Sequence, residues 1–283
     1  MAEEIQRLSN DEFPPLLREI PDPPEILWIS GTLPSIEGKK LLTVVGSRSY
    51  TSYGKQACEH LVRSLARYPV VIVSGLALGI DALAHKSALE ADIPTIAVPG
   101  SGLGSKVLYP RSNHSLAKTI VERGGALVSE YEPSQEASPW TFPKRNRLMA
   151  GMSHATLVIE ASRKSGTLIT ARLATEYNRD VLAVPGSIFN ERSEGPNFLL
   201  HSGAVPITNT GDLHAALGFT AKETVRPELT ESEEAVYELL AQPLPRDELL
   251  AQLNMSAAEA NMLLSAMEIK GLIAELLGEV RRI

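Results

Sequence analysis

The sequence contains a single cysteine, Cys58, among 283 residues. A disulfide framework and a cysteine-based zinc site are therefore excluded. Long apolar runs are also missing, because the longest are strand-sized stretches such as Val70–Val73, so no segment can span a membrane. The N-terminus has no apolar core behind a basic start, which argues against a signal peptide. These absences predict a cytoplasmic protein.

Aromatic residues are scarce, at 5% of the chain, and the net charge is −7. The charge is unevenly spread along the sequence. Residues 41–218 carry 17 basic and 14 acidic residues, whereas residues 1–40 and 219–283 have net charges of −4 and −6. A mildly basic centre between two acidic ends weakly indicates an anionic partner for the centre. The 43% of hydrophobic and 22% of charged residues are typical of a globular protein.

The middle of the chain alternates short apolar runs with helical patterns. The strand-like runs are Leu41–Val45, Val70–Val73, Pro94–Val98, Ala126–Val128, Thr156–Ile159 and Val181–Val184. This alternation predicts an α/β fold, namely an extended Rossmann-like parallel sheet with helices on both faces, over residues 41–218. Residues 1–40 are rich in proline without a helical period, and we expect them to form an extended lead-in.

The tail has a different pattern. After a linker at residues 219–228, three helices are predicted over Glu231–Ala241, Arg246–Leu253 and Ser256–Ile269. Residues 272–276 and 279–283 can then pair as a hairpin. Residues 229–283 therefore predict a small winged-helix-like α+β domain.

Ligands of open parallel sheets bind beyond the carboxyl ends of the strands. Five of the predicted strand ends carry small residues that expose backbone N–H groups to an anion such as phosphate. Three of these loops supply the candidate residues Gly46, Ser47, Arg48, Ser74, Gly75, Ser165, Gly166 and Thr167. A single glycine loop is more simply explained as a chain turn. Five loops on one sheet edge favour a phosphate site, although neither G-x-G-x-x-G after the first strand nor G-x-x-x-x-G-K-[ST] is present.

The densest basic cluster lies in the segment WTFPKRNR, in which Lys144, Arg145 and Arg147 follow Trp140 and Phe142. Cations beside aromatic rings suit single-stranded nucleic acid, because phosphates meet the charges and bases stack on the rings. The alternative is a solvated helix start with both rings in the core. The six histidines show no metal-ligand spacing and no G-x-S-x-G elbow is present, so we expect neither a metal site nor a catalytic group.

Eight motifs in order resemble the DNA-processing protein A family (DprA, also called Smf) of bacterial natural transformation. The resemblance covers residues 41–218. The motifs are VGSR (45–48) with Tyr53-Gly54, SGLALGIDALAH (74–85), YPRSN (109–113), SEYEP (129–133), FPKRNRLMAG (142–151), SGTLITA (165–171), VPGS (184–187) and GPNFLLHSGA (195–204).

The resemblance implies a protein that binds and protects single-stranded DNA, loads the RecA recombinase on it, forms a homodimer and is not an enzyme; no cofactor is expected. It assigns DNA contacts to Arg48, Phe142, Lys144, Arg145, Asn146 and Arg147. It also implies a dimer contact at Phe198, Leu199, Leu200 and His201. The forty proline-rich residues leave no room for the helical N-terminal domain of many members, and the function of the family's variable tail does not transfer.

Two other functions compete with this interpretation. One is a nucleoside-monophosphate phosphoribohydrolase-like enzyme, whose signature is P-G-G-x-G-T-x-x-E. The segment SGTLITARLATE lacks the two preceding glycines, and its glutamate, Glu176, lies nine residues past Thr167. The other alternative is a purely structural scaffold, for which five phosphate-ready loops have no purpose.

Overall fold

The computed structural model describes residues 5–219, 229–253, 255–270, 272–276 and 278–282. By their contacts, the residues up to Ala221 and those from Lys222 onward form two compact units.

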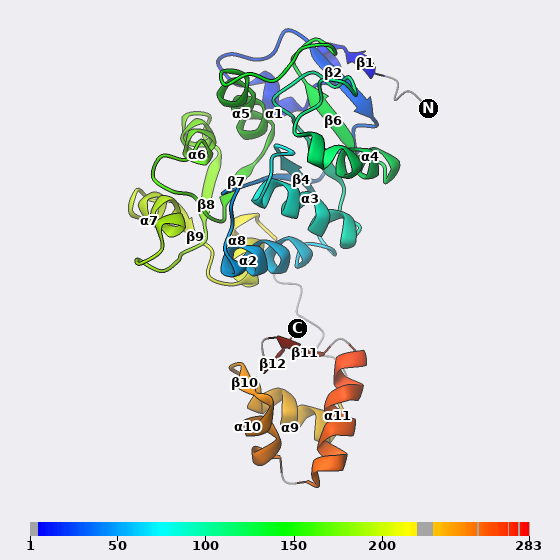
Figure 1. Ribbon diagram of the computed structural model, residues 1–283, viewed down its shortest axis with the longest axis vertical. Coiled ribbons are helices and arrows are strands. Elements are labelled where there is room, and N and C mark those ends of the chain that lie inside the picture. The colour runs from blue at the N-terminus through cyan, green and yellow to red at the C-terminus, as the bar shows by residue number, and fades with distance from the viewer. Residues whose placement is uncertain (1–4, 220–228, 254, 271, 277, 283) are drawn as a thin grey trace. The chain divides into compact units, whose positions relative to one another are not determined.

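The first unit contains a sheet of nine described strands (Figure 1). They are β1 (Ile5–Leu8), β2 (Leu27–Gly31), β3 (Lys40–Val45), β4 (Val70–Ser74), β5 (Thr95–Ala97), β6 (Ala126–Ser129), β7 (Ala155–Val158), β8 (Asp180–Ala183) and β9 (Val205–Pro206). Their order is β1-β2-β6-β5-β4-β3-β7-β8-β9, and every pair from β6 to β9 is parallel. The predicted Rossmann-like parallel sheet is confirmed.

The first forty residues contribute to this sheet. β2 pairs with β6 in the antiparallel sense, and β1 pairs in turn with β2. A short helix, α1 (Pro15–Arg18), lies between β1 and β2 in the sequence, and its Leu17 is fully buried. The segment expected to be an extended lead-in therefore completes one edge of the sheet.

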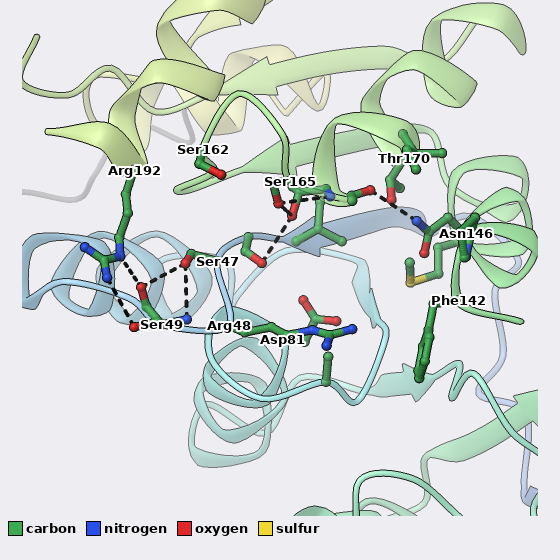
Figure 2. A pocket seen from close by; sticks show the side chains of 18 of the residues that line it. Ser47, Arg48, Ser49, Asp81, Phe142, Asn146, Ser162, Ser165, Thr170 and Arg192 are labelled. Carbon is green, nitrogen blue, oxygen red and sulfur yellow. Dashed lines mark hydrogen bonds between the residues drawn. The ribbon is translucent and has the colours of Figure 1, made fainter. Parts of the chain in front are cut away.

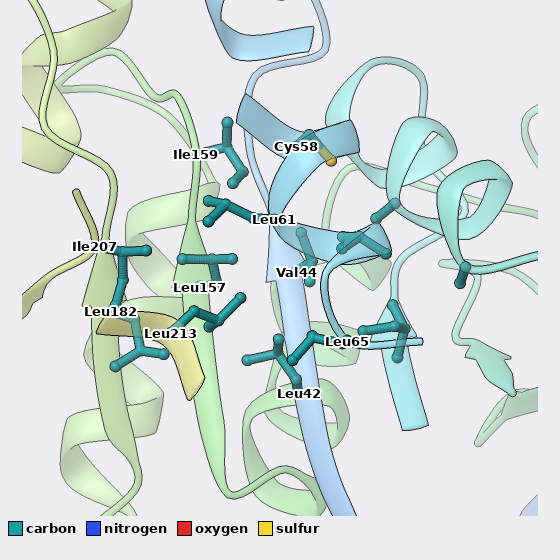
Figure 3. Packing of buried hydrophobic residues seen from close by; sticks show 14 of the residues in the cluster. Leu42, Val44, Cys58, Leu61, Leu65, Leu157, Ile159, Leu182, Ile207 and Leu213 are labelled. Carbon is teal, nitrogen blue, oxygen red and sulfur yellow. The ribbon is translucent and has the colours of Figure 1, made fainter. Parts of the chain in front are cut away.

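Helices cover both faces of the sheet. They are α2 (Ser52–Arg63), α3 (Ile80–Glu90), α4 (His114–Glu122), α5 (Thr141–Met152), α6 (Thr167–Glu176), α7 (Glu194–His201) and α8 (Thr210–Ala216). β3 shows why two layers form, because all of its residues from Leu41 to Val45 are buried. Alternate side chains of a strand point to opposite faces. Leu42 and Val44 pack with α2, α3 and α8, as Figure 3 shows, whereas Leu41 and Val45 pack with α1, α5 and α6.

The second unit is a small α+β domain. It comprises α9 (Glu231–Leu239), β10 (Leu244–Pro245), α10 (Arg246–Gln252), α11 (Ala257–Ile269), β11 (Ile273–Leu276) and β12 (Glu279–Arg282). Capping boxes start α9 at Thr230 and α11 at Ser256, where Glu233 and Glu259 close the boxes. β11 and β12 form the predicted hairpin across Gly278, which has a positive φ of 83°. The predicted winged-helix domain is confirmed, and β10 adds a third strand beside β12 that the sequence did not predict.

Candidate nucleic-acid interface

A pocket of about 420 Å³ opens at the carboxyl ends of β3 and β7 (Figure 2). Its walls are the loop after β3, the start of α3, the first half of α5, the start of α6 and the turn η3 (Glu191–Ser193). The predicted site residues that line it are Gly46, Ser47, Arg48, Phe142, Arg145, Asn146, Ser165, Gly166 and Thr167. Segments more than a hundred residues apart in the sequence therefore meet at one edge of the sheet.

The amino end of α6 forms one wall of the pocket. The N–H of Thr167 donates to Oγ of Ser165 (3.2 Å), and the Thr167 hydroxyl donates to the carbonyl oxygen of Gly46 (3.2 Å). Asn146 donates to the carbonyl oxygen of Gly166 (3.3 Å). A side chain on Gly166 would meet no atom within 4 Å, so its backbone is open to a ligand. The N–H groups of Thr167, Leu168 and Ile169 are bonded within this turn, so the dipole of α6 is what favours a negative charge here.

Arg48 and Phe142 form the opposite rim. The guanidinium carbon of Arg48 lies 5.3 Å from the centroid of the Phe142 ring, which is a cation–π distance. Phe142 is half-buried and lies against Gly100, where a Cβ would come within 2.5 Å of the ring. The pocket thus presents the long, positively charged side chain of Arg48 beside the flat apolar ring of Phe142. Trp140 is 57% exposed, so neither aromatic residue of this segment is enclosed in the core.

Arg192 is a further guanidinium on the pocket wall. It donates to the backbone carbonyl of Ser49 and to the Ser49 hydroxyl (3.2 Å), which ties η3 to the loop that carries Arg48. Arg192 was not among the residues predicted for the site. Its sequence position did indicate this place, because Arg192 comes shortly after Pro185–Ser187, the loop that follows the sixth predicted strand at the same edge of the sheet.

Arg145 is buried under the pocket with Asp81. Arg145 is 4% exposed, and its Nη1 donates to the carbonyl oxygens of Gly75 (2.6 Å) and Val98. Burial lowers the pKa of Arg145 to about 10, against the effect of Asp81. Burial raises the pKa of the Asp81 carboxyl, opposed first by Arg145 and then by the backbone N–H groups of Ala77 and Gly75. Much of this cation's hydrogen-bonding capacity is therefore used inside the protein, where it joins the ends of β4 and β5.

Lys144 and Arg147 lie outside this pocket. Arg147 is buried, where it donates to the carbonyl oxygen of Asp22 (2.8 Å) and pairs with the carboxylate of Glu130. Lys144 is half-exposed, 3.5 Å from the same carboxylate. Burial raises the pKa of Glu130, and Arg147 and Lys144 act against this rise. These two cations hold α5 against the N-terminal segment and the end of β6.

Ser74 and Gly75 also lie apart from the main pocket. Ser74 is fully buried, and its hydroxyl donates to the carbonyl oxygen of Val44 (2.6 Å), so it fixes β4 to β3. Gly75 lines a neighbouring cavity of only about 20 Å³. A side chain at Gly75 would clash with Arg145 and Asp81 at 2.5 Å, so this glycine makes room for the buried pair.

The four residues of the predicted dimer contact lie on α7 near the β9 edge of the sheet. Phe198 is 40% exposed and carries the guanidinium of Arg163 at 4.2 Å from its ring centroid. Leu199 and Leu200 are partly buried, and His201 is exposed. The described residues thus present a partly apolar surface beside an edge strand, β9, whose Val205 is 42% exposed.

Within the described part of the chain, no helix is long and apolar enough to cross a membrane. Over the same residues, no group of three or more histidine, cysteine, aspartate or glutamate side chains could hold a metal ion.

The chain thus combines a Rossmann-like sheet, which carries a pocket at its strand ends, with a winged-helix domain. Residues 4–218 match the model of the family described as DNA recombination-mediator protein A. Residues 220–279 match the DprA winged helix domain. The chain belongs to the DprA/Smf family, as its motifs predict.

Known relatives agree with this assignment. The chain is 41% identical over 211 residues to Protein Smf of Escherichia coli, and this alignment covers 75% of this chain and 56% of the relative. It thus spans little more than half of that protein's length. The structure of DNA processing protein A from Streptococcus pneumoniae aligns with a TM-score of 0.69 and 38% identity, covering 75% of this chain and 74% of that one. The Helicobacter pylori protein, for which a single-stranded DNA binding mode is described, aligns with a TM-score of 0.68 and 32% identity over 77% of this chain and 98% of its own.

Proposed function

We propose that the protein binds single-stranded DNA at the strand-end pocket and acts as a recombination mediator. The arrangement of charged and aromatic groups in the pocket supports this proposal. It sets the exposed guanidinium of Arg48 and the amino end of α6 beside the ring of Phe142. Phosphates suit the cation and the positive end of the α6 dipole, and a base suits the ring, which is the combination that sequence-tolerant single-strand binding uses. The binding mode described for the Helicobacter pylori relative supports the same ligand.

The size of the pocket favours a single strand over a duplex. A volume of about 420 Å³ accommodates a nucleotide-sized group and not a double helix. A base reaches such a pocket only when it is unpaired, because pairing and stacking hold it inside a duplex.

In its cellular role, we infer that the protein protects incoming single strands in the cytoplasm and helps to load RecA on them during natural transformation. We also infer a homodimer through α7 and β9. The exposed ring of Phe198 and the place of β9 at the end of the sheet of described strands support this interface, because edge strands and apolar patches favour association.

The phosphoribohydrolase alternative finds little support in the geometry. Thr167 opens α6 in the pocket, whereas Glu176 ends the same helix at its other terminus and pairs with Arg172 at 3.4 Å. The carboxylates that line the pocket are Asp81, which is engaged by backbone N–H groups and Arg145, and Glu191.

The test compares a labelled single strand, a duplex of the same sequence, and AMP. We expect binding of the single strand with a marked salt dependence, weaker binding of the duplex, and no release of adenine from AMP. Equal affinity for the duplex, or hydrolysis of AMP, would overturn the proposal. RecA loading is measured as the rate of RecA filament formation on the single strand with and without the protein.

A further inference from the structure

We propose that Leu78 and Tyr109 form a second contact for single-stranded DNA, a platform on which a base adjoining the pocket stacks. The inference rests on the proposed function and adds a site to it. Both side chains are 45% exposed although they are large and apolar. They line the small cavity next to the main pocket, and the two cavities share Arg48, Phe142 and Arg145.

The aromatic surface continues from the pocket onto this platform. The Tyr109 and Phe142 ring centroids are 5.7 Å apart, with an angle of 59° between the rings. Arg48 lies over the Phe142 ring at 5.3 Å. A strand whose phosphate meets Arg48 therefore has the half-buried ring of Phe142 and, next to it, the exposed ring of Tyr109 within reach of its bases. The cavity itself, at about 20 Å³, holds no more than a water molecule, so the base must lie on the outer faces of Leu78 and Tyr109.

The platform is held in place before any ligand arrives. Asn113 is buried, and its amide donates to the carbonyl oxygens of Leu76 (2.8 Å) and Ala77 (3.2 Å), which joins the loop of Leu78 to the segment of Tyr109. The N–H of Tyr109 donates to Oγ of Ser101 (3.1 Å). A fixed backbone under an exposed aromatic ring reduces the ordering cost of binding.

The surrounding charges favour a nucleic acid as the occupant. Residues 93–121 contain no aspartate or glutamate, whereas Lys106 and Arg111 are exposed within them. Phe189 carries a more exposed ring, at 95%, but lines neither of the two cavities. It precedes Glu191 and Glu194, which would repel a phosphate backbone. The strand is therefore expected to leave the pocket past Tyr109 and not past Phe189.

The experiment compares Tyr109→Ala, Tyr109→Phe and the control Phe189→Ala in the full chain. Binding to a long oligothymidylate and to thymidine monophosphate is measured by titration over a series of salt concentrations. Loss of one base–aromatic stack predicts a roughly tenfold weaker Kd of Tyr109→Ala for the long oligomer. Tyr109→Phe keeps the ring and should stay close to wild type. The salt slope should not change, because no charge is removed, and thymidine monophosphate, which has no adjoining base, should bind all variants alike.

The platform would be overturned, and the proposed function left intact, if Tyr109→Ala bound the long oligomer with the same Kd as the wild type. An equal loss of affinity in Phe189→Ala would have the same meaning. A wild-type protein that binds no single strand would instead remove the proposed function. Photo-crosslinking of the wild-type protein to an oligomer with 5-iodouracil gives a readout that does not depend on folding of a variant. The adduct should map to Tyr109, and adducts confined to other residues would also overturn the platform.

Discussion

Arg48→Ala should weaken single-strand binding for all sequences alike. Arg48 is the exposed cation of the pocket, set over the Phe142 ring at 5.3 Å. A hydrogen bond to a charged group contributes about 1.5–3 kcal/mol, and exposure to solvent places Arg48 at the lower end of this range. A loss of about 1.5 kcal/mol corresponds to a roughly tenfold higher Kd.

The salt dependence separates this contact from a general loss of affinity. Each phosphate contact on a single strand contributes about 0.7 to the slope of log K against log salt concentration. Arg48→Ala should therefore flatten the slope by about 0.7, whereas Arg48→Lys should keep the slope and lose the paired hydrogen bonds of the guanidinium. Fluorescence anisotropy of a labelled oligomer over a salt series measures both quantities.

Two control variants fix the interpretation. Arg63→Ala removes an exposed arginine on α2 that pairs with Glu90, and it should change neither affinity nor slope. Lys144→Ala removes a cation that lies 3.5 Å from Glu130 outside the pocket, so its effect should be clearly smaller than that of Arg48→Ala. An unchanged slope for Arg48→Ala, or an equal loss for Lys144→Ala, would refute the assignment of the pocket.

Three further results are expected. Deletion of residues 220–283 should leave single-strand affinity unchanged or higher at low salt, because α11 carries no lysine or arginine and the tail is acidic; a large loss from a folded, dimeric truncation would contradict this. Phe198→Glu should convert the dimer to a protomer in light scattering, and a protomer mass for the wild type at micromolar concentration would remove the interface. Burial lowers the pKa of His85 to about 3, below the unfolded value of 6.5, so the unfolded chain takes up the proton first. The free energy of unfolding should therefore fall as the pH decreases from 6.5 toward 3, and it should fall less steeply in His85→Asn. Urea denaturation over this pH range measures the difference, and an equal pH dependence of both proteins would contradict the prediction.

The sequence was informative about strands that are buried on both faces. β3 and β4 are continuous apolar runs because helices cover both sides, and their predicted ends lie within one residue of the observed ones. β1 and β2 gave no comparable signal. Each is at most five residues long, and β2 exists through its pairing with β6, about a hundred residues away. A pairing of this kind is set by tertiary contacts and not by local pattern.

The same distinction applies to the pocket. Small residues mark Gly46–Arg48, directly after β3, and Ser165–Thr167, at the start of α6 in the loop that follows β7, and both segments lie where parallel-strand topology places them. Burial of charged side chains on α5 has no local signature. Arg145 and Arg147 occur in a polar stretch that is typical of a solvated helix, yet both are enclosed by strand ends and by the N-terminal segment.

The distribution of partners among the cations determines what the site can offer a polyanion. Glu130 pairs with both Arg147 and Lys144, Asp22 lies 3.4 Å from Arg147, and Asp81 with backbone carbonyls engages Arg145. The densest basic cluster of the sequence, Lys144, Arg145 and Arg147, therefore serves largely to hold α5 in place. Positive potential at the pocket then comes from Arg48, Arg192 and the amino end of α6, which are spread around its rim. Such a rim suits one phosphate with its base at a time, and a longer strand gains affinity only through neighbouring contacts such as Tyr109.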